Sequence, residues 1–447
     1  MEQKRDIDEL TRLVVEGGDQ EILSFLKILH PADIADLLES LDDSGRRRLL
    51  ELMDHQTAAD VISEVEDPYL EDMVKRLRID ELSKIVGDMD SDDAADLLSE
   101  LSDEEVRAVL AILDAEDVAE IGELMRHPED TAGGIMQAEL VALKASSTVS
   151  QAIDEIRAQA DEVRKIHNIY VVDDSEKLVG VASLRELILA DPNSILDSVM
   201  TKNVIKARVD MDQEEVADQF RRYDLVSLPV EDVNGKLVGR VTVDDIVDVL
   251  DEEADEDFLK MAGSVEEEVL SSFGKSVRAR FPWLLASWIG MLITSVLIGK
   301  FLDSSEKLIL FVPFLPLILG MGGNVGGQSA TVVVRGIATG KLDARRMWQV
   351  AYKEMGVGFA LGAIYGLLLG VCALFLGQGP NMMALIVGLS LTIQLAIAAT
   401  SGVLLPIIFH RLNTDPALAT APFITTIMDI VGATLYFSMA LIVIGRS

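Results

Sequence analysis

The chain has 447 residues, too many for one ordinary domain, and a formal net charge of −36. Residues 1–270 hold 69 Asp and Glu against 27 Lys and Arg, whereas residues 271–447 hold 6 against 12. A surface as negative as that of the first part repels phosphate, which argues against nucleic acid as a partner of this part and favours cations. The single cysteine excludes an intrachain disulfide framework, and the five scattered histidines have no zinc-ligand spacing.

Residues 1–130 have apolar residues at the three-and-four spacing of amphipathic helices, with acidic faces. One pattern recurs in four segments: LHPADIADLLESL (29–41), MDHQTAADVISEV (53–65), MDSDDAADLLSEL (89–101) and LDAEDVAEIGELM (113–125). The seventh residue of each is alanine, which lets helices approach, and an acid follows it. We predict stacked helical pairs in a small superhelix. Packing and solubility alone would also explain the pattern.

Residues 131–250 contain a second repeat. Its two copies are IYVVDDSEKLVGVASLRELI (169–188) and LPVEDVNGKLVGRVTVDDIV (228–247), and each predicts strand, turn, strand and helix. The shared KLVG turn and the step from the second strand into the helix resemble a tandem pair of CBS domains. The resemblance implies an α/β regulatory module, a class that often binds adenosine nucleotides.

In that family the nucleotide is usually held by a Ser or Thr, followed by an Asp one helical turn later. Thr242 and Asp245 match this pattern in the second copy, and Arg185 is a further candidate in the first copy. Glu186 stands where the first copy would need Asp, so the sequence leaves nucleotide binding open. ATP or another adenosine nucleotide is the expected ligand if the site is used.

Residues 251–280 change from an acidic end, DEEADEDF, to a basic one, KSVRARF. We predict one connecting helix here, between the CBS pair and the apolar half of the chain. It is either a structural spacer or a lever that operates a gate.

Five apolar stretches follow Pro282, each reaching the roughly 20 residues that a helix needs to cross a bilayer. They lie at 282–302, 308–334, 352–376, 382–409 and 418–444. We therefore predict an all-α transmembrane domain of five helices over residues 281–447, at the end of a multidomain membrane protein.

Basic residues gather in alternate loops around these stretches. They are Lys275, Arg278, Arg280, Arg335, Lys341, Arg345, Arg346, Lys353 and Arg411. By the positive-inside rule, these loops face the cytoplasm, which places the N-terminus inside and the C-terminus outside. The chain starts with MEQKRDIDEL, which is charged and has none of the apolar core of a signal peptide, in agreement with a cytoplasmic start.

The second stretch is expected to be an interrupted helix. Pro313 and Pro316 precede the glycine-rich segment GMGGNVGGQSAT (320–331), whose backbone would be unpaired in lipid and would have to line protein or water. Asn324 and Gln328 offer carbonyl oxygens at helical spacing, suited to a hydrated cation. Close helix packing by the glycines is the alternative.

Asp429 is the one acid that lies clear of both ends of a predicted span, in the middle part of the last one. An uncompensated carboxylate there costs a few kcal/mol, so Asp429 is a functional candidate. Thr425, Thr426 and Gly432 beside it are typical of a polar, closely packed pore wall. A neutral or hydrogen-bonded structural acid is the alternative.

The order of these parts resembles the MgtE family of Mg2+ transporters over the whole chain. The matching membrane motifs are GGNVGGQSAT, KEMGVGFALG (353–362), DPALAT (415–420) and TTIMDIVG around Asp429. The resemblance implies a homodimeric Mg2+ channel in the plasma (inner) membrane, with Asp429 of both subunits holding hydrated Mg2+. Because Mg2+ dehydrates reluctantly, carboxylates that grip it through water can select it and leave it mobile.

The resemblance also implies cytoplasmic Mg2+ sites that close the pore at high Mg2+ and leave it open at low Mg2+. Crowded carboxylates repel one another until a cation bridges them. The candidates are Asp92, Asp93, Asp96, Asp212, Glu214, Asp245, Asp248, Glu253, Glu256, Asp257 and Asp415.

Two other readings stay open on the sequence. One is an ion-coupled carrier, which would also use a broken second helix. The other is a membrane-anchored sensor of Mg2+ or nucleotide, which would transport no ion. An enzyme is not expected, since the sequence has no nucleophile paired with a base, no P-loop and no catalytic metal spacing.

Overall fold

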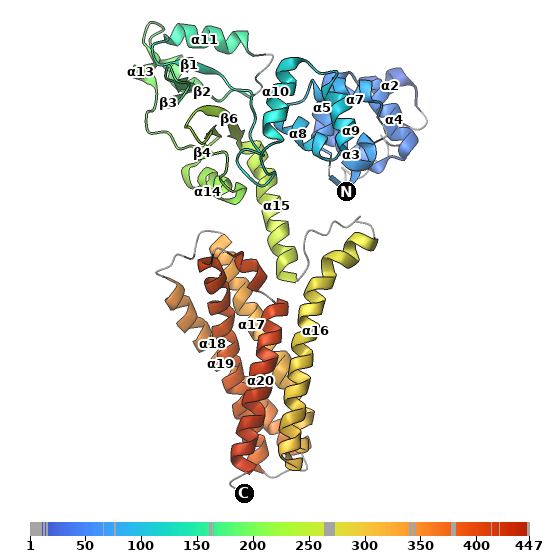
Figure 1. Cartoon of the computed structure of the whole chain (residues 1–447), viewed down its shortest axis with the longest axis vertical. Coiled ribbons are helices and arrows are strands. Elements are labelled where there is room, and N and C mark those ends of the chain that lie inside the picture. Colours follow the sequence, from blue (N-terminus) through green and yellow to red (C-terminus); the bar gives the residue numbers. More distant parts are fainter. Residues whose placement is uncertain are drawn as a thin grey trace. The chain divides into compact units, whose positions relative to one another are not determined.

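The computed structural model divides into two compact units, Met1–Asp251 and Glu252–Ser447, and each is described by itself (Figure 1). The residues that the structure describes are 17–65, 67–75, 77–160, 165–262, 273–338, 346–376, 381–412, 414–419 and 421–444, with Thr11, Val14, Val163 and Leu342.

The first unit begins with a series of short helices. They are α2 (Asp19–Leu26), α3 (Pro31–Ser40), α4 (Asp43–Leu52), α5 (His55–Ile62), α6 (Asp67–Val74), α7 (Ile79–Val86), α8 (Ser91–Ser99), α9 (Asp103–Leu110) and α10 (Ala115–Leu124). Each of the four sequence repeats forms one helix, since α3, α5, α8 and α10 lie in the four repeated segments in order. Helices this short are marginal alone, so they depend on the core that they share.

The repeated alanine is buried in three of the four helices. Ala35, Ala59 and Ala95 are almost fully buried, as the repeat predicts. The prediction is wrong for Ala119, which is exposed, although Ile121 and Leu124 of the same helix are buried.

The remainder of the first unit is the predicted pair of α/β repeats. The first copy has β1 (Ala142–Lys144), α11 (Val149–Ala158), β2 (Asn168–Val172), β3 (Leu178–Ser183) and α12 (Leu184–Leu189). After α13 (Leu196–Val199), the second has β4 (Ala207–Arg208), α14 (Gln213–Tyr223), β5 (Ser227–Glu231), β6 (Leu237–Thr242) and α15 (Val243–Ala262). Each copy forms a three-stranded sheet in which the first strand pairs parallel and the next two antiparallel.

The turn between the antiparallel strands shows how closely the two copies correspond. Gly235 has a φ of +80° in the second copy, and Glu176, at the matching position of the first, has a φ of +61°. Glycine adopts this left-handed conformation without strain, whereas Glu176 adopts it at a cost of order 1–3 kcal/mol, so the fold imposes the turn on both sequences.

The two copies differ in what they pack against. The second copy shares one hydrophobic core with the helical segment, through residues such as Ala94, Met136, Val216 and Ile246. The first copy has a separate core around Val149, Ile169 and Leu187. The acids of α8 are thereby brought to the second copy.

The predicted connecting helix begins earlier than expected. It is continuous with the repeat, because α15 starts at Val243, directly after β6, and runs to Ala262. Residues 263–272 of the predicted helix lie outside the described residues, and α16 (Phe273–Ser304) follows them.

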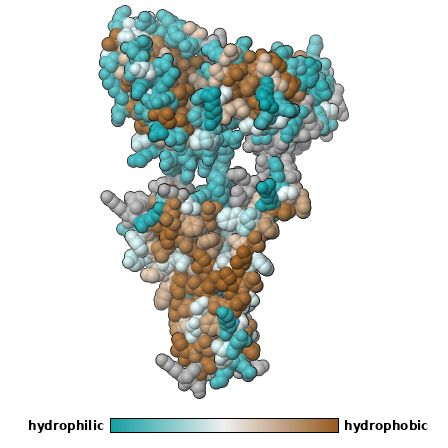
Figure 2. Space-filling view, in the orientation of Figure 1, coloured by the Kyte–Doolittle hydropathy of each residue, from teal (hydrophilic) through white to brown (hydrophobic). Residues whose placement is uncertain are grey.

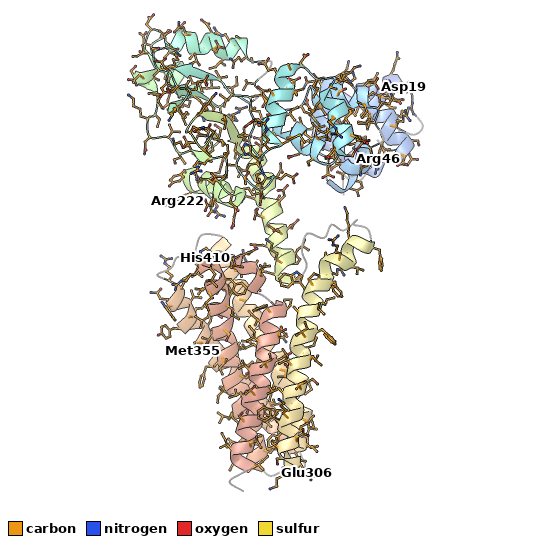
Figure 3. All side chains as sticks on the ribbon, viewed as in Figure 1. Asp19, Arg46, Arg222, Glu306, Met355 and His410 are labelled. Carbon is orange, nitrogen blue, oxygen red and sulfur yellow. The ribbon has the colours of Figure 1, made fainter. Side chains whose placement is uncertain are left out.

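Among the residues that the structure describes, the second unit contains five helices long and apolar enough to span a membrane, as predicted. After α16 come the 3-10 helix η1 (Glu306–Phe314), α17 (Leu315–Ala338), α18 (Met347–Leu376), α19 (Asn381–Arg411), the 3-10 turn η2 (Pro416–Ala419) and α20 (Ala421–Ile444). Hydrophobic residues cover most of the bundle surface in Figure 2, and Figure 3 places Glu306 and His410 at opposite ends of the bundle. The loop basic residues Lys341 and Arg345 lie outside the described part.

The expected break at the glycine-rich segment is wrong, since α17 runs unbroken through GMGGNVGGQSAT. The irregular part comes earlier, where η1 contains Pro313, and Pro316 sits in the first turn of α17, where its missing N–H is tolerated. Gly322, Gly323 and Gly326 serve close packing instead. A Cβ added at Gly326 would come within 2.6 Å of Ile424, and one added at Gly402 of α19 within 2.2 Å of the Gly326 carbonyl.

Candidate pore and cation sites

Asp429 lies on α20, in the part of the bundle where α20 contacts α16, α17 and α19. Its side chain is half-buried and makes no hydrogen bond or ion pair with any residue that the structure describes. Its neighbour Thr426 packs against Gly290 of α16 and donates its hydroxyl to the Pro422 carbonyl at 2.9 Å. Asp429 is therefore a membrane carboxylate whose partner is not supplied by the described part of its own helix bundle.

Thr425, also predicted at the pore, is half-buried between α20 and α17. A Cβ added at Gly323 would lie 3.0 Å from its methyl group and 3.1 Å from its hydroxyl. Thr425 thus packs α20 closely against α17, one turn before Asp429.

Asn324 and Gln328 are exposed on α17, where they form one face together with Thr331. Gly320 and Gly327 share this face, and a Cβ built on either would meet no described atom within 4 Å. The opposite face of α17 is packed in the bundle. A polar face on a membrane helix is stable only against water or another protein surface. We therefore expect water or a second protein chain to cover this face of α17.

Glu354 is a membrane acid that sequence reasoning missed as a site residue. It lies on α18, directly before Met355 (labelled in Figure 3), and only 8% of it is exposed. Its carboxylate accepts a hydrogen bond from the Ser329 hydroxyl of α17 at 3.0 Å, and Lys353 lies 3.5 Å away. Its position near the start of a predicted span, inside the motif KEMGVGFALG, was the available signal.

Two candidate acids of α8 meet the second α/β copy. Asp92 is buried, its Oδ1 has no hydrogen-bond partner among the described residues, and burial together with the Asp245 charge raises its pKa well above the ordinary value. Burial, then the charges of Asp90 and Asp245, raise the pKa of Asp93 to about 7. These acids lie far from Asp245 in the sequence and still repel it directly.

Asp245 is held at this junction by its own helix start. The Thr242 backbone N–H donates to its carboxylate at 3.1 Å, and the Thr242 hydroxyl lies 2.7 Å from it. Burial raises the pKa of Asp245 to about 6, against the lowering effect of Thr242. Asp244 beside it pairs with Lys165. We call Asp92, Asp93 and Asp245 the junction cluster.

The same arrangement recurs in the first copy, where the Glu186 carboxylate accepts from the Ser183 N–H at 2.8 Å and hydroxyl at 3.0 Å. Glu186 therefore caps its helix as Asp245 does, despite the change from Asp to Glu. Arg185 is exposed on α12, whereas Thr242 is fully buried beside the junction cluster. The structure does not bring these predicted nucleotide residues together as one open site.

The other candidates of the first unit are more exposed. Partial burial, then Glu64, raises the pKa of Asp248, which lies one turn after Asp245 on α15. Asp212 caps α14 by accepting from the Glu214 N–H at 2.9 Å, and both side chains are exposed, as is Asp96.

The predicted acids at the end of α15 do come together with Asp415. Lys260 pairs with Glu256 and, at 2.7 Å, with Asp415, whose carboxylate also accepts from the Ala417 N–H at 2.7 Å. Burial, then the charge of Asp415, raises the pKa of Asp257 to about 6. We call Glu253, Glu256, Asp257 and Asp415 the helix-end cluster.

Neither cluster is a closed coordination sphere. Within the described residues, no three His, Cys, Asp or Glu side chains stand close enough to hold a metal ion directly. Carboxylates that are too far apart to bind a cation directly can still hold it through its water shell. This suits Mg2+ better than a cation that sheds its water readily.

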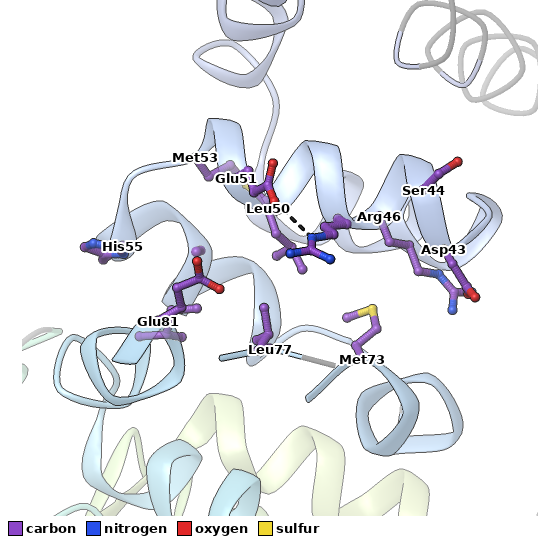
Figure 4. Close-up of a pocket in the computed structure, with 13 residues that line it drawn as sticks. Asp43, Ser44, Arg46, Leu50, Glu51, Met53, His55, Met73, Leu77 and Glu81 are labelled. Carbon is purple, nitrogen blue, oxygen red and sulfur yellow. Dashed lines mark hydrogen bonds and ion pairs between the residues drawn. The ribbon is translucent and has the colours of Figure 1, made fainter. Parts of the chain in front are cut away.

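A cavity of about 520 Å³ opens between α4, α5, α6 and α7 (Figure 4). Apolar side chains line it, among them Leu50, Met53, Met73 and Leu77, together with charged side chains such as Arg46. None of the predicted site residues lines it.

Comparison with protein families finds three matches along the chain. Residues 315–439 match MgtE, described as a divalent cation transporter, and residues 29–130 match the MgtE intracellular N domain. Residues 132–193 and 196–252 each match the CBS domain.

Similar whole proteins and solved structures agree with these matches. The magnesium transporter MgtE of Thermus thermophilus is 37% identical over 446 residues, and that of Bacillus subtilis 32% over 445, with 98% of each chain covered in both comparisons. A crystal structure of the soluble part of a magnesium transporter covers 56% of this chain and 99% of its own, at 33% identity and a TM-score of 0.53. The cytosolic domain of the Mg2+ channel MgtE in complex with ATP covers 54% and 99%, at 36% identity and a TM-score of 0.52.

Proposed function

This chain belongs to the MgtE family of magnesium transporters and is a multi-pass membrane protein, and from that membership we propose that it is a homodimeric Mg2+ channel closed by cytoplasmic Mg2+. The observation that carries the proposal is Asp429, a carboxylate inside the membrane bundle without a partner among the described residues. A transporter family also agrees with the expectation that the chain is not an enzyme.

The dimer is supported by the polar face of α17. Asn324, Gln328 and Thr331 are exposed on it, among the residues that the structure describes. A two-fold axis beside this face would bring two copies together and let their carbonyl oxygens and the two Asp429 carboxylates line one hydrated path. Mg2+ would then pass with its water shell, held by paired carboxylates too far apart to strip it.

The alternatives lose support. The ion-coupled carrier was favoured by a broken second helix, and α17 is continuous through its glycines. A membrane-anchored sensor would not need an unpaired carboxylate inside the bundle, since that residue costs folding free energy.

Gating is proposed to act through the junction cluster and the helix-end cluster. Both hold acids whose repulsion opposes the compact arrangement, and Mg2+ would relieve that repulsion. To raise the ratio of closed to open channels from 1:99 to 99:1, the ions must bind the closed state more tightly than the open state by about 5.5 kcal/mol. Several weak sites can supply this free energy jointly.

An adenosine nucleotide at the CBS pair is supported by the relative solved with ATP. In this chain Thr242 is fully buried and Asp245 belongs to the junction cluster, so we do not assign either residue to the nucleotide. Arg185 does fit, since it is exposed and its guanidinium can pair with a phosphate. We therefore propose the first copy as the nucleotide site.

Replacing Asp429 by Ala tests the conduction proposal. We expect Mg2+ flux into liposomes containing the purified protein to be abolished while the dimer persists, because the variant cannot hold the hydrated ion. Asp303→Asn, which removes an exposed acid at the end of α16, is the matched control and should conduct as wild type. Wild-type flux in Asp429→Ala would refute the proposal.

A further inference from the structure

Gln394 is a fully buried polar residue in the middle of α19, an apolar membrane helix. Its side-chain amide lies where α17, α19 and α20 meet. Burying an amide away from water costs free energy that an apolar side chain of the same size would not, so packing alone does not account for it.

The orientation of the amide is determined by its partners. The Nε2 group donates to the Met428 carbonyl of α20 at 2.9 Å, and the buried Oε1 has no partner among the described residues. Exchanging the two atoms would set the amide oxygen against the carbonyl oxygen and leave two buried N–H donors without this acceptor. The hydrogen bond to Met428 is therefore the contact for which the amide is placed.

Two glycines make room for this amide. A Cβ added at Gly322 of α17 would lie 2.6 Å from Nε2, and one added at Gly432 of α20 would lie 2.7 Å from it. Both helices thus leave space for the same nitrogen, and Gly432 is one turn after the carbonyl that the amide binds.

Met428 directly precedes Asp429, so the hydrogen bond acts on the turn that carries the pore acid. We propose that Gln394 is a positioning residue for Asp429, which sets the rotation of α20 and hence the distance between the carboxylate and the hydrated ion. The inference rests on the proposed function, because it assigns Gln394 a role in the selectivity of that same pore.

The test compares Mg2+ and Ca2+ flux in liposomes containing the whole protein. Gln394→Met keeps the volume and removes the donor, and Gly432→Ala displaces the amide without changing it. One hydrogen bond between membrane helices changes an equilibrium constant by about fivefold to tenfold. We therefore expect the ratio of Mg2+ flux to Ca2+ flux to fall by about that factor in both variants.

Ser390→Ala is the matched control. Ser390 is also buried on α19 and contacts α20, through the Met439 sulfur at 3.4 Å, but it lies away from the Asp429 turn. This variant should keep the wild-type ratio.

An unchanged ratio in Gln394→Met or Gly432→Ala overturns the inference, even if total flux falls, because lost stability reduces the amount of active channel without changing its preference. If Gln394→Met does not fold, Gly432→Ala decides. Failure of the underlying function has a different signature, since wild type would carry no Mg2+ or Asp429→Ala would conduct normally.

Discussion

At the scale of single residues, burial separates the acids of this chain. Asp36 and Asp96 follow the repeated alanines on exposed faces, whereas Asp92 and Asp93, on the same helix as Asp96, turn inward to Asp245. The ionised form of the inward acids is disfavoured by both burial and mutual repulsion. A cation that binds there changes the stability of the fold as well as the local charge.

The junction cluster predicts a pH dependence of stability. The pKa of Asp93 rises from an ordinary 3.8 to about 7 and that of Asp245 to about 6 in the folded protein, so protonation stabilises the fold. This contribution is fully present below pH 3.8 and is lost as the pH rises through 6 to 7. Without divalent cations, thermal unfolding of the whole protein in detergent should occur several degrees lower at about pH 8 than at about pH 5.5.

Two additions make that measurement specific. Mg2+ should raise the unfolding temperature at about pH 8 back to its value at about pH 5.5, and should raise it little at about pH 5.5. Asp93→Asn should reduce the dependence of the unfolding temperature on pH. Asp36→Asn, at an exposed acid of α3, is the control and should keep it. A pH dependence equal in wild type and Asp93→Asn would show that the junction cluster does not produce it.

At the scale of elements, α15 links a CBS repeat to the helix-end cluster without interruption. Its first turn carries Asp245 and its last turn carries Lys260, which pairs with Glu256 and Asp415. Lys260 thus supplies a positive charge at the place where the proposed mechanism requires Mg2+. One continuous helix therefore carries both Asp245, an acid proposed to sense Mg2+, and Lys260, a cation that would compete with Mg2+.

Opposite shifts in gating are expected from the two sides of this ion pair. Lys260→Gln removes the competing charge, so Mg2+ should close the channel at about fivefold lower concentration. Glu256→Gln removes a carboxylate that would bind Mg2+, so closure should require about fivefold more Mg2+. A fivefold change corresponds to about 1 kcal/mol, the size expected for one ion pair. Patch-clamp currents under varied cytoplasmic Mg2+ measure both. Lys300→Gln, at the exposed end of α16, is the control. Shifts in the same direction would contradict competition at this cluster.

At the scale of the whole molecule, the division of charge predicts which side of the membrane each loop faces. The positive-inside rule places the start of α16 in the cytoplasm and its end outside. In a Cys372→Ser background, a membrane-impermeant maleimide on intact cells should label Ser304→Cys but label Gly274→Cys only after permeabilisation. Both positions are exposed at opposite ends of α16. Labelling of Gly274→Cys alone would invert the proposed orientation.

Much of the architecture could be predicted from the sequence, because it depends on periodicity along the chain. The repeated segments reappear as helices and paired strands, and five apolar stretches reappear as five long helices. The continuity of α17 could not be predicted, since the same glycines suit both a break and close packing.

The sequence by itself determined the fold class, the family and the position of Asp429 within a span, because these depend on local pattern and hydrophobic length. Only the tertiary structure decided that Asp92 and Asp93 meet Asp245, that Ser329 binds the buried Glu354, and that Gln394 holds the turn before Asp429. Burial and electrostatic repulsion depend on distances in space, and packing alone sets those distances between segments far apart in the chain.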